Sequence, residues 1–463
     1  MNKKSIILAL ALCLYLAVGH TAFAATGKPV LVSGTWNRSQ TQSVQLYKVE
    51  NGELQLLKSA AIDPADHSFL FALQATPAGS FYYIGSSTAP ESRFAFYLKE
   101  GDQLSFAAND SSYVLTGHDN SVENQTLEAW HNFVQPLEYK AEYFRRNNST
   151  YVDFFPLLDE KVEALKSYPA AHTPNKAFNQ SFETYKRINF TALALDFLFK
   201  PRSAQPQEED YADFYRDLRV ADYTTTTDLL DYPGGVGFIN ELLSVKAWIG
   251  GQKLRGFEGL LEHLNEIPND TLRGELVLMG ARTKRSYAGL TDYEAKYANL
   301  FVTARQKALL QQLKTALVVV KKGVPATDFR LPDIQGKPVA LSELKGKVVY
   351  IDFWATWCGP CKKEIPSLKK LEEEYHGQNI VFLSVSMDKT KDHEKWKNFV
   401  GTEQLKGIQL FAGDKGGREL SANYKISGIP RFVLVGADGN IVAADAPRPS
   451  STEIRPLLNS LLK

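Results

Sequence analysis

Two cysteines separated by two residues, Cys358 and Cys361, constrain this chain more than any other feature. The apolar run from Val348 to Trp354 precedes the pair and predicts a buried strand, and the amphipathic pattern that follows predicts a helix. The unpaired N–H groups at the start of a helix favour a negative charge nearby. They lower a cysteine pKa from about 8.5 into a range of about 3.5–7.5, which makes the sulfur a nucleophile near neutral pH.

The N-terminal segment predicts export. Two lysines precede an apolar run from Ile6 to Val18, and Ala22-Phe23-Ala24 supplies small residues where a signal peptidase cleaves. We therefore expect residues 1–24 to be a signal peptide that is removed together with Cys13. An uncleaved membrane anchor is the alternative, although the run is short for a membrane span.

The small number of cysteines indicates that the pair serves chemistry. The chain has 3 cysteines, and loss of Cys13 would leave only Cys358 and Cys361. A disulfide across two residues closes a very short loop and would stabilise the fold little. Half of a zinc site is the alternative, for which only His376 and His393 are near in sequence. We expect no metal.

Chain length indicates the number of domains, and net charge limits the classes of partner that we expect. A chain of 463 residues exceeds the size of one core, so several domains are expected. Its 53 basic and 52 acidic side chains nearly cancel, so the composition gives no electrostatic reason to expect nucleic acid as a partner.

The hydrophobic pattern divides the exported chain into three parts. Residues 25–119 alternate with period two between turn signals, which predicts an all-β, sandwich-like domain. Residues 120–322 have helical periodicity, which predicts an all-α region. Residues 323–463 alternate strand and helix patterns, which predicts an α/β domain with a partly parallel sheet. Near its end, Ser450 and Glu453 predict a capping box for a closing helix.

The last part resembles the thioredoxin-fold domains of the TlpA/ResA type. Five features occur in the order found in that family. They include a Leu-Ser-Glu-Leu-Lys-Gly-Lys segment before the strand, the cysteine motif, an Ile-Pro pair and an Asp-Gly turn after that pair. The matching segments are 325–329, 341–347, 353–361, 428–430 and 438–439. The resemblance implies a thioredoxin fold over residues 323–463. It implies that Cys358 attacks a disulfide, whereas Cys361 resolves the mixed disulfide. We expect Cys358 to have the more exposed sulfur.

The resemblance also implies a substrate-contact face around the cysteines. Pro430 matches the cis-proline that faces the cysteines in this fold, and the residue before it pairs with an extended peptide through its backbone. The Gly-Pro dipeptide between the cysteines accompanies reducing members of the family. The expected substrate-binding residues are Trp357, Gly359, Pro360, Ile429 and Pro430.

Two acidic residues are further candidates. Asp352 lies in the apolar strand, where burial without a partner raises the pKa of a carboxyl group. It matches the buried acid that shuttles a proton for the inner thiol of thioredoxins, and an ion pair with Lys347 is the alternative. Glu364 matches an acidic position beside the active site of ResA-like domains. It is equally compatible with a surface acid that the helix dipole favours.

These observations predict an exported thiol–disulfide oxidoreductase of the periplasm or cell envelope. We expect it to reduce disulfides in envelope proteins and to be recharged by a membrane-bound electron donor, with no cofactor. One alternative is a thioredoxin-fold peroxidase, although its usual Pro-x-x-x-Thr-x-x-Cys pattern is not present before Cys358. Another is a protein that binds a peptide or glycan and carries an accessory thioredoxin domain.

Overall fold

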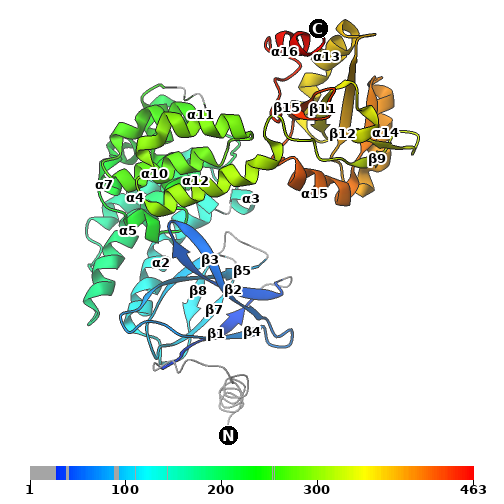
Figure 1. The fold of residues 1–463 in the computed structure, drawn as a ribbon. Coiled ribbons are helices and arrows are strands. Elements are labelled where there is room, and N and C mark those ends of the chain that lie inside the picture. The colour runs from blue at the N-terminus through cyan, green and yellow to red at the C-terminus, as the bar shows by residue number, and fades with distance from the viewer. Residues whose placement is uncertain are drawn as a thin grey trace. The chain divides into compact units, whose positions relative to one another are not determined.

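The computed structural model describes residues 28–37, 41–87, 93–109, 111–142, 144–252, 254 and 256–463, and Figure 1 draws its fold. The signal peptide expected over residues 1–24, with Cys13, lies outside the described residues. The chain divides into two compact units, of which the first ends at Asn269 and the second begins at Asp270. The domain boundaries expected after residues 119 and 322 stay predictions.

Two four-stranded sheets begin the first unit, in the orders β4-β1-β7-β8 and β3-β2-β5-β6. Strand β1 is parallel to β7, and the other neighbouring strands in these two sheets are antiparallel. Alternate side chains of both sheets meet in one core that includes Trp36, Phe94 and Phe106. The all-β character predicted from the period-two pattern is confirmed. The strands are β1 (Val30–Trp36), β2 (Ser43–Glu50), β3 (Glu53–Ala61), β4 (Ser68–Leu73), β5 (Ser80–Ser86), β6 (Arg93–Leu98), β7 (Gln103–Ala108) and β8 (Tyr113–Leu115).

The helical region follows the sheets, as the periodicity predicts. Polar side chains fix where its helices begin: Asn175 accepts a hydrogen bond from Phe178 N at 3.0 Å, and Thr303 accepts one from Gln306 N at 3.1 Å. In the first unit the helices are α2 (Val122–Glu142), α3 (Phe144–Asn147), α4 (Tyr151–Leu165), α5 (Lys176–Phe199), α6 (Asp213–Asp217), α7 (Ala221–Thr224), α8 (Gly235–Ile249) and α9 (Gly256–Leu260). The second unit opens with α10 (Asp270–Ala281), α11 (Tyr287–Tyr297) and α12 (Ala304–Leu317).

A five-stranded sheet in the order β13-β12-β11-β14-β15 organises the C-terminal part (Figure 1). Strands β11, β12 and β13 are parallel, whereas β14 and β15 add antiparallel pairs, so the predicted partly parallel sheet is confirmed. The strands are β9 (Arg330–Pro332), β10 (Pro338–Ala340), β11 (Val348–Trp354), β12 (Ile380–Ser386), β13 (Ile408–Phe411), β14 (Arg431–Val435) and β15 (Ile441–Ala443). The helices are α13 (Gly359–Glu374), α14 (His393–Thr402), α15 (Gly413–Asn423) and α16 (Ile454–Leu461).

Strand β11 is buried along its whole length and sends alternate side chains into two cores. Val349, Ile351 and Phe353 pack with α15 and the β9–β10 hairpin. Val348 and Tyr350 pack with α13 and α16 on the opposite face. Because side chains alternate, Asp352 shares its face of the sheet with Tyr350 and therefore with the helix that carries the cysteines.

The capping box predicted from Ser450 and Glu453 is wrong. Helix α16 begins at Ile454, and its N-cap residue Glu453 makes no side-chain cap. The Ser450 hydroxyl instead donates to Glu364, 86 residues earlier in the chain, at 3.0 Å. The Ser450 side chain therefore makes a tertiary hydrogen bond and does not cap α16.

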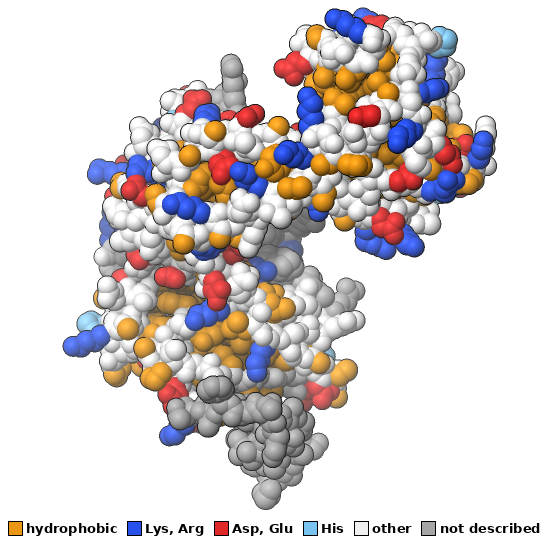
Figure 2. Space-filling view, viewed as in Figure 1, with side chains coloured by type: hydrophobic (Ala, Val, Ile, Leu, Met, Phe, Trp, Pro, Cys, Tyr) orange, Lys and Arg blue, Asp and Glu red, His pale blue; other side chains and the backbone are white. Residues whose placement is uncertain are grey.

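Charges of both signs are mixed over the face of the molecule that Figure 2 shows. Figure 2 shows Lys and Arg side chains interspersed with Asp and Glu over the visible face, in keeping with the net charge of +1. Among the described residues, no helix has both the length and the apolar composition that crossing a lipid bilayer requires.

Candidate active site

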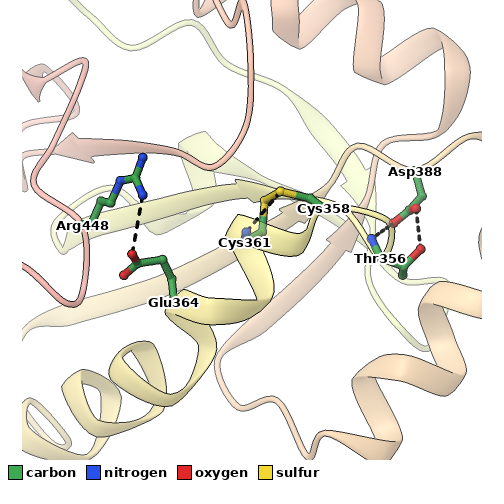
Figure 3. The surroundings of a disulfide bond; sticks show 6 residues. All are labelled: Thr356, Cys358, Cys361, Glu364, Asp388 and Arg448. Carbon is green, nitrogen blue, oxygen red and sulfur yellow. Dashed lines mark hydrogen bonds and ion pairs between the residues drawn. A yellow bond between two sulfur atoms is a disulfide. The ribbon is translucent and has the colours of Figure 1, made fainter. Parts of the chain in front are cut away.

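Cys358 and Cys361 lie at the start of α13, as the sequence predicts, and are joined by a disulfide whose Cα atoms are 5.3 Å apart (Figure 3). Cys358 is the N-cap residue of the helix, and Cys361 N donates a hydrogen bond to its Sγ atom at 3.2 Å. The sulfur of Cys358 therefore faces a backbone donor at the positive end of the helix dipole. In the reduced enzyme the same donor would favour the thiolate over the thiol.

Exposed residues surround a buried disulfide. The two cysteines are each 4% exposed, whereas Trp357 is 62% exposed and both Gly359 and Pro360 are exposed. The two cysteines are thus equally buried as whole residues in the disulfide form, and the expectation that Cys358 has the more exposed sulfur stays a prediction. Both cysteines pack into one apolar cluster with Trp354, Trp396 and Phe411.

The peptide bond between Ile429 and Pro430 is cis, as expected. Ile429 packs against the cluster that contains both cysteines, so the segment before β14 borders the disulfide. Arg431 follows the proline with its side chain buried, and its guanidinium pairs with Asp445 at 3.0 Å. Sequence reasoning missed Arg431, which ties the chain after the proline to the loop beyond β15.

Asp352 is buried, at 8% exposure, and its Oδ1 atom has no hydrogen-bond partner. Burial raises its pKa from 3.8 to about 8, and the nearby charges of Glu364 and Glu372 act in the same direction. The alternative ion pair with Lys347 is wrong, because the Lys347 side chain is exposed to solvent. The group is therefore a protonated acid over most of the neutral range.

A narrow cleft connects Asp352 with Cys361. We call it the Asp352 cleft. It is also lined by Trp354, Glu372 and Gln409, and it leaves about 10 Å³ for the centre of a water molecule, which is the room that one water needs. Three buried polar atoms in its wall lack hydrogen-bond partners: Asp352 Oδ1, Trp354 Nε1 and Gln409 Oε1. Together they offer one donor and two acceptors, which suits a bridging water.

Glu372 is a second acid of the Asp352 cleft that sequence reasoning missed. Burial raises its pKa from 4.5 to about 7, although Lys406 and Lys369 act in the opposite direction. Its position was detectable, because 11 residues separate it from Cys361 and three helical turns bring both side chains to one face of α13.

Glu364 lies one turn beyond Cys361 and is buried, at 8% exposure, so the surface-acid alternative is wrong. Its carboxylate accepts hydrogen bonds from Ser450 N at 3.1 Å and Ser450 Oγ at 3.0 Å. Arg448 lies 3.7 Å away as an ionic partner (Figure 3). Glu364 therefore ties α13 to the segment before α16, and its charge contributes to the raised pKa of Asp352.

Asp388 is a fully buried carboxylate that holds the loop before Cys358, and it was also missed. It accepts hydrogen bonds from Thr356 N at 2.9 Å and Thr356 Oγ1 at 2.7 Å (Figure 3). Ser386 Oγ donates to it as well, at 2.8 Å. Because 32 residues separate Asp388 from Thr356, no local pattern could have joined them.

A metal centre was the other possible use of the cysteines. Within the described ranges, no group of three or more His, Cys, Asp or Glu side chains is arranged to hold a metal ion.

Comparisons with known proteins agree with this geometry. The Redoxin family model matches residues 321–460. "Thiol-disulfide oxidoreductase ResA" of Halalkalibacterium halodurans is 32% identical over 124 residues, which cover 27% of this chain and 68% of that protein. "Thioredoxin-like protein YneN" of Bacillus subtilis is 32% identical over 134 residues, which cover 29% and 76%. The chain belongs to the ResA-like thiol–disulfide oxidoreductase family.

The family match is confined to residues 321–460, which we call the ResA-like domain. ResA of Bacillus cereus is 35% identical over 120 residues, which cover 26% of this chain and 66% of that protein. The solved structure of a thiol–disulfide oxidoreductase from Bacteroides fragilis is 27% identical and covers 30% of this chain and 99% of its own, with a TM-score of 0.27. The first unit lies outside the residues that the Redoxin model matches.

Proposed function

We propose that the chain is an exported thiol–disulfide oxidoreductase that reduces disulfides in proteins of the periplasm or cell envelope. The observation that carries this proposal is the placement of Cys358 as N-cap of α13, with Cys361 N donating to its sulfur. The ResA-like relatives support the reaction class.

In the proposed reaction, the Cys358 thiolate attacks one sulfur of a substrate disulfide. A mixed disulfide forms, and the other substrate sulfur leaves as a thiolate and takes up a proton. The thiol of Cys361 then loses its proton and attacks Cys358 Sγ. The enzyme disulfide forms, the mixed disulfide breaks, and the second substrate sulfur leaves as a thiolate. Two electrons pass from the enzyme to the substrate.

The ionised form of Asp352, which a pKa of about 8 makes the minor form at pH 7, is the proposed acceptor of the Cys361 proton. Both residues line the Asp352 cleft, which has room for one bridging water. An ordinary thiol has a pKa of about 8.5, and burial raises the pKa of Asp352 to about 8. A carboxylate whose pKa lies this close to the working pH is suited to act as a general base.

The direction of the reaction is part of the proposal. The Cys-Gly-Pro-Cys sequence resembles reducing enzymes, for which thioredoxin sets a scale of about −270 mV, against about −120 mV for the oxidant DsbA. That gap corresponds to roughly 7 kcal/mol. In an oxidising compartment the enzyme disulfide must be reduced again after each turnover, so we infer a membrane-bound electron donor as partner.

Trapping of mixed disulfides tests the proposal. A Cys361→Ala variant keeps the attacking sulfur but cannot release the substrate, so we expect envelope proteins attached to Cys358. Attachment should disappear in the Cys358→Ala/Cys361→Ala control. If the single variant captures no proteins, the proposed nucleophile is wrong.

Two further measurements separate the alternatives. A reduction potential near the DsbA end of the scale would contradict the assignment as reductant. A peroxidase whose peroxidatic residue is Cys358 would still consume one equivalent of peroxide after Cys361→Ser, whereas a disulfide reductase should not.

A further inference from the structure

A cavity of about 320 Å³ lies within the first unit and has no part in the proposed redox reaction. Residues from strands of both sheets, including β5, β6 and β8, and from α2, α5 and α8 line it. We call it the Tyr232 cavity, after a tyrosine in its wall. Its volume falls at the lower end of the range of small-molecule sites.

Acidic side chains from three helices meet in the Tyr232 cavity. Glu138 and Glu142 come from α2, Asp196 from α5 and Glu241 from α8. Burial raises the pKa of Glu241 to about 8, and the charge of Asp196 adds to this effect. Burial also raises the pKa of Asp196, against the opposing charge of Lys200. At neutral pH Glu241 therefore holds a proton that a bound cation would displace.

The basic groups in the wall already have other contacts. Arg93 places its guanidinium over the ring of Tyr47, 5.1 Å from the centroid. His131 Nδ1 lies 3.3 Å from Glu138 Oε2. The positive charge that acts on Asp196 and Glu241 is that of Lys200, which is not a wall residue. Within the wall, four acidic side chains stand against Arg93 and His131, so the wall as a whole favours a cation.

Three buried polar atoms of the wall residues Arg93, Tyr113 and His131 lack hydrogen-bond partners, and the first is the Nε atom of Arg93, an N–H donor. His131 is 7% exposed and Tyr113 is 2% exposed, and both line the cavity. His131 Nε2 and Tyr113 Oη have no partner in the structure. In the neutral imidazole, a proton on Nδ1 that faces Glu138 leaves Nε2 as an acceptor. Buried polar atoms are usually paired, so an acceptor of this kind points to a ligand with N–H donors.

Aromatic rings complete the wall. Tyr83, Trp130, Tyr185 and Tyr232 all face the cavity. Tyrosine and tryptophan rings attract cations through their faces and also cover methylene groups. The described residues offer no metal-type cluster of His, Cys, Asp and Glu, so an organic cation suits this wall better than a metal ion.

We propose that the Tyr232 cavity binds an alkylammonium group, in which Glu241 and Asp196 supply the countercharge and the tyrosines cover the alkyl chain. The group belongs either to a free small amine or to a lysine side chain of a peptide. This inference does not depend on the proposed redox function.

Calorimetric titration of the full chain with 1,4-diaminobutane tests the proposal. The neutral analogue 1,4-butanediol has the same length, and a blocked Gly-Lys-Gly peptide presents the same ammonium group on a lysine. We expect the diamine or the peptide to bind with a Kd below about 1 mM and the diol not to bind. Diamine binding assigns the site to a free amine, and binding of the peptide alone assigns it to a lysine side chain. Equal binding of diol and diamine, or no binding of either amine, would overturn the proposal.

Variants and proton release make the test specific. Glu241→Gln preserves the shape of a side chain that is neutral at pH 7, and we expect it to weaken binding at least about tenfold. Asp196→Asn should act in the same direction, and the exposed Glu160→Gln should change nothing. In the parent chain, titrations in buffers of different ionisation enthalpy should show close to one proton released per ligand at pH 7. Unchanged affinity in both cavity variants, or no proton release, would refute the assignment.

Discussion

Replacing Asp352 by Asn should stabilise the ResA-like domain and at the same time slow its chemistry. The wild-type carboxyl is buried and has no hydrogen-bond partner on Oδ1, and burial holds its pKa near 8 instead of 3.8. Unfolding exposes the group to water and lets it ionise. The native state therefore binds a proton that the unfolded state releases, over the window between these two pKa values.

The magnitude follows from linkage. Because the folded pKa is raised, stability from this group is fully present below pH 3.8 and falls as the pH rises towards 8. The slope is about 1.4 kcal/mol per pH unit, so the free energy of unfolding should fall by about 4 kcal/mol between about pH 4 and pH 7. Asn does not titrate, so the difference in stability between the variant and wild type should grow with pH by this amount.

Hydrogen exchange of the amides in β11 and β12 measures this difference in the full chain. The stability of the Asn variant relative to wild type should rise steadily from pH 4 to pH 7, while the surface control Glu419→Gln runs parallel to wild type. A difference independent of pH would refute the reasoning, since it would mean that Asp352 is ionised in the folded protein. Disulfide reduction by the Asn variant should be slower near neutral pH, and an unchanged pH–rate profile would remove its role in proton transfer.

Three other substitutions test the surroundings of the disulfide. Glu372→Gln should flatten the pH–rate profile near pH 7, because burial raises the pKa of this acid to about 7 at the cleft; an unchanged profile would exclude it from proton transfer. Glu364→Gln removes a charge that raises the pKa of Asp352, so the Asp352 carboxyl should titrate at lower pH in infrared spectra, and no shift would contradict this. Thr356→Val removes a hydrogen bond to buried Asp388 and should destabilise the domain by about 1–3 kcal/mol in denaturant unfolding; a change near zero would show that the contact does not stabilise the fold.

The parts of the site that could be predicted are those whose sequence signals lie in neighbouring residues. An apolar run, a cysteine pair and a proline in the first helical turn identify β11 and the start of α13 without any long-range contact. Helix α15 was missed, because Gly416 and Gly417 lie inside it and lower its intrinsic helix propensity. It is stabilised by Leu420 and by Tyr424 just after it, which pack in the core beneath the sheet.

The sequence by itself determined the alternation of strands and helices in the last domain apart from α15, the position of the cysteines at a helix start and the burial of Asp352. Each follows from the periodicity and conformational preferences of neighbouring residues. Only the tertiary structure decided the partners of the buried acids. Ser450 reaches Glu364 across 86 residues and Thr356 reaches Asp388 across 32, because a buried polar group takes whichever donor the fold brings to it.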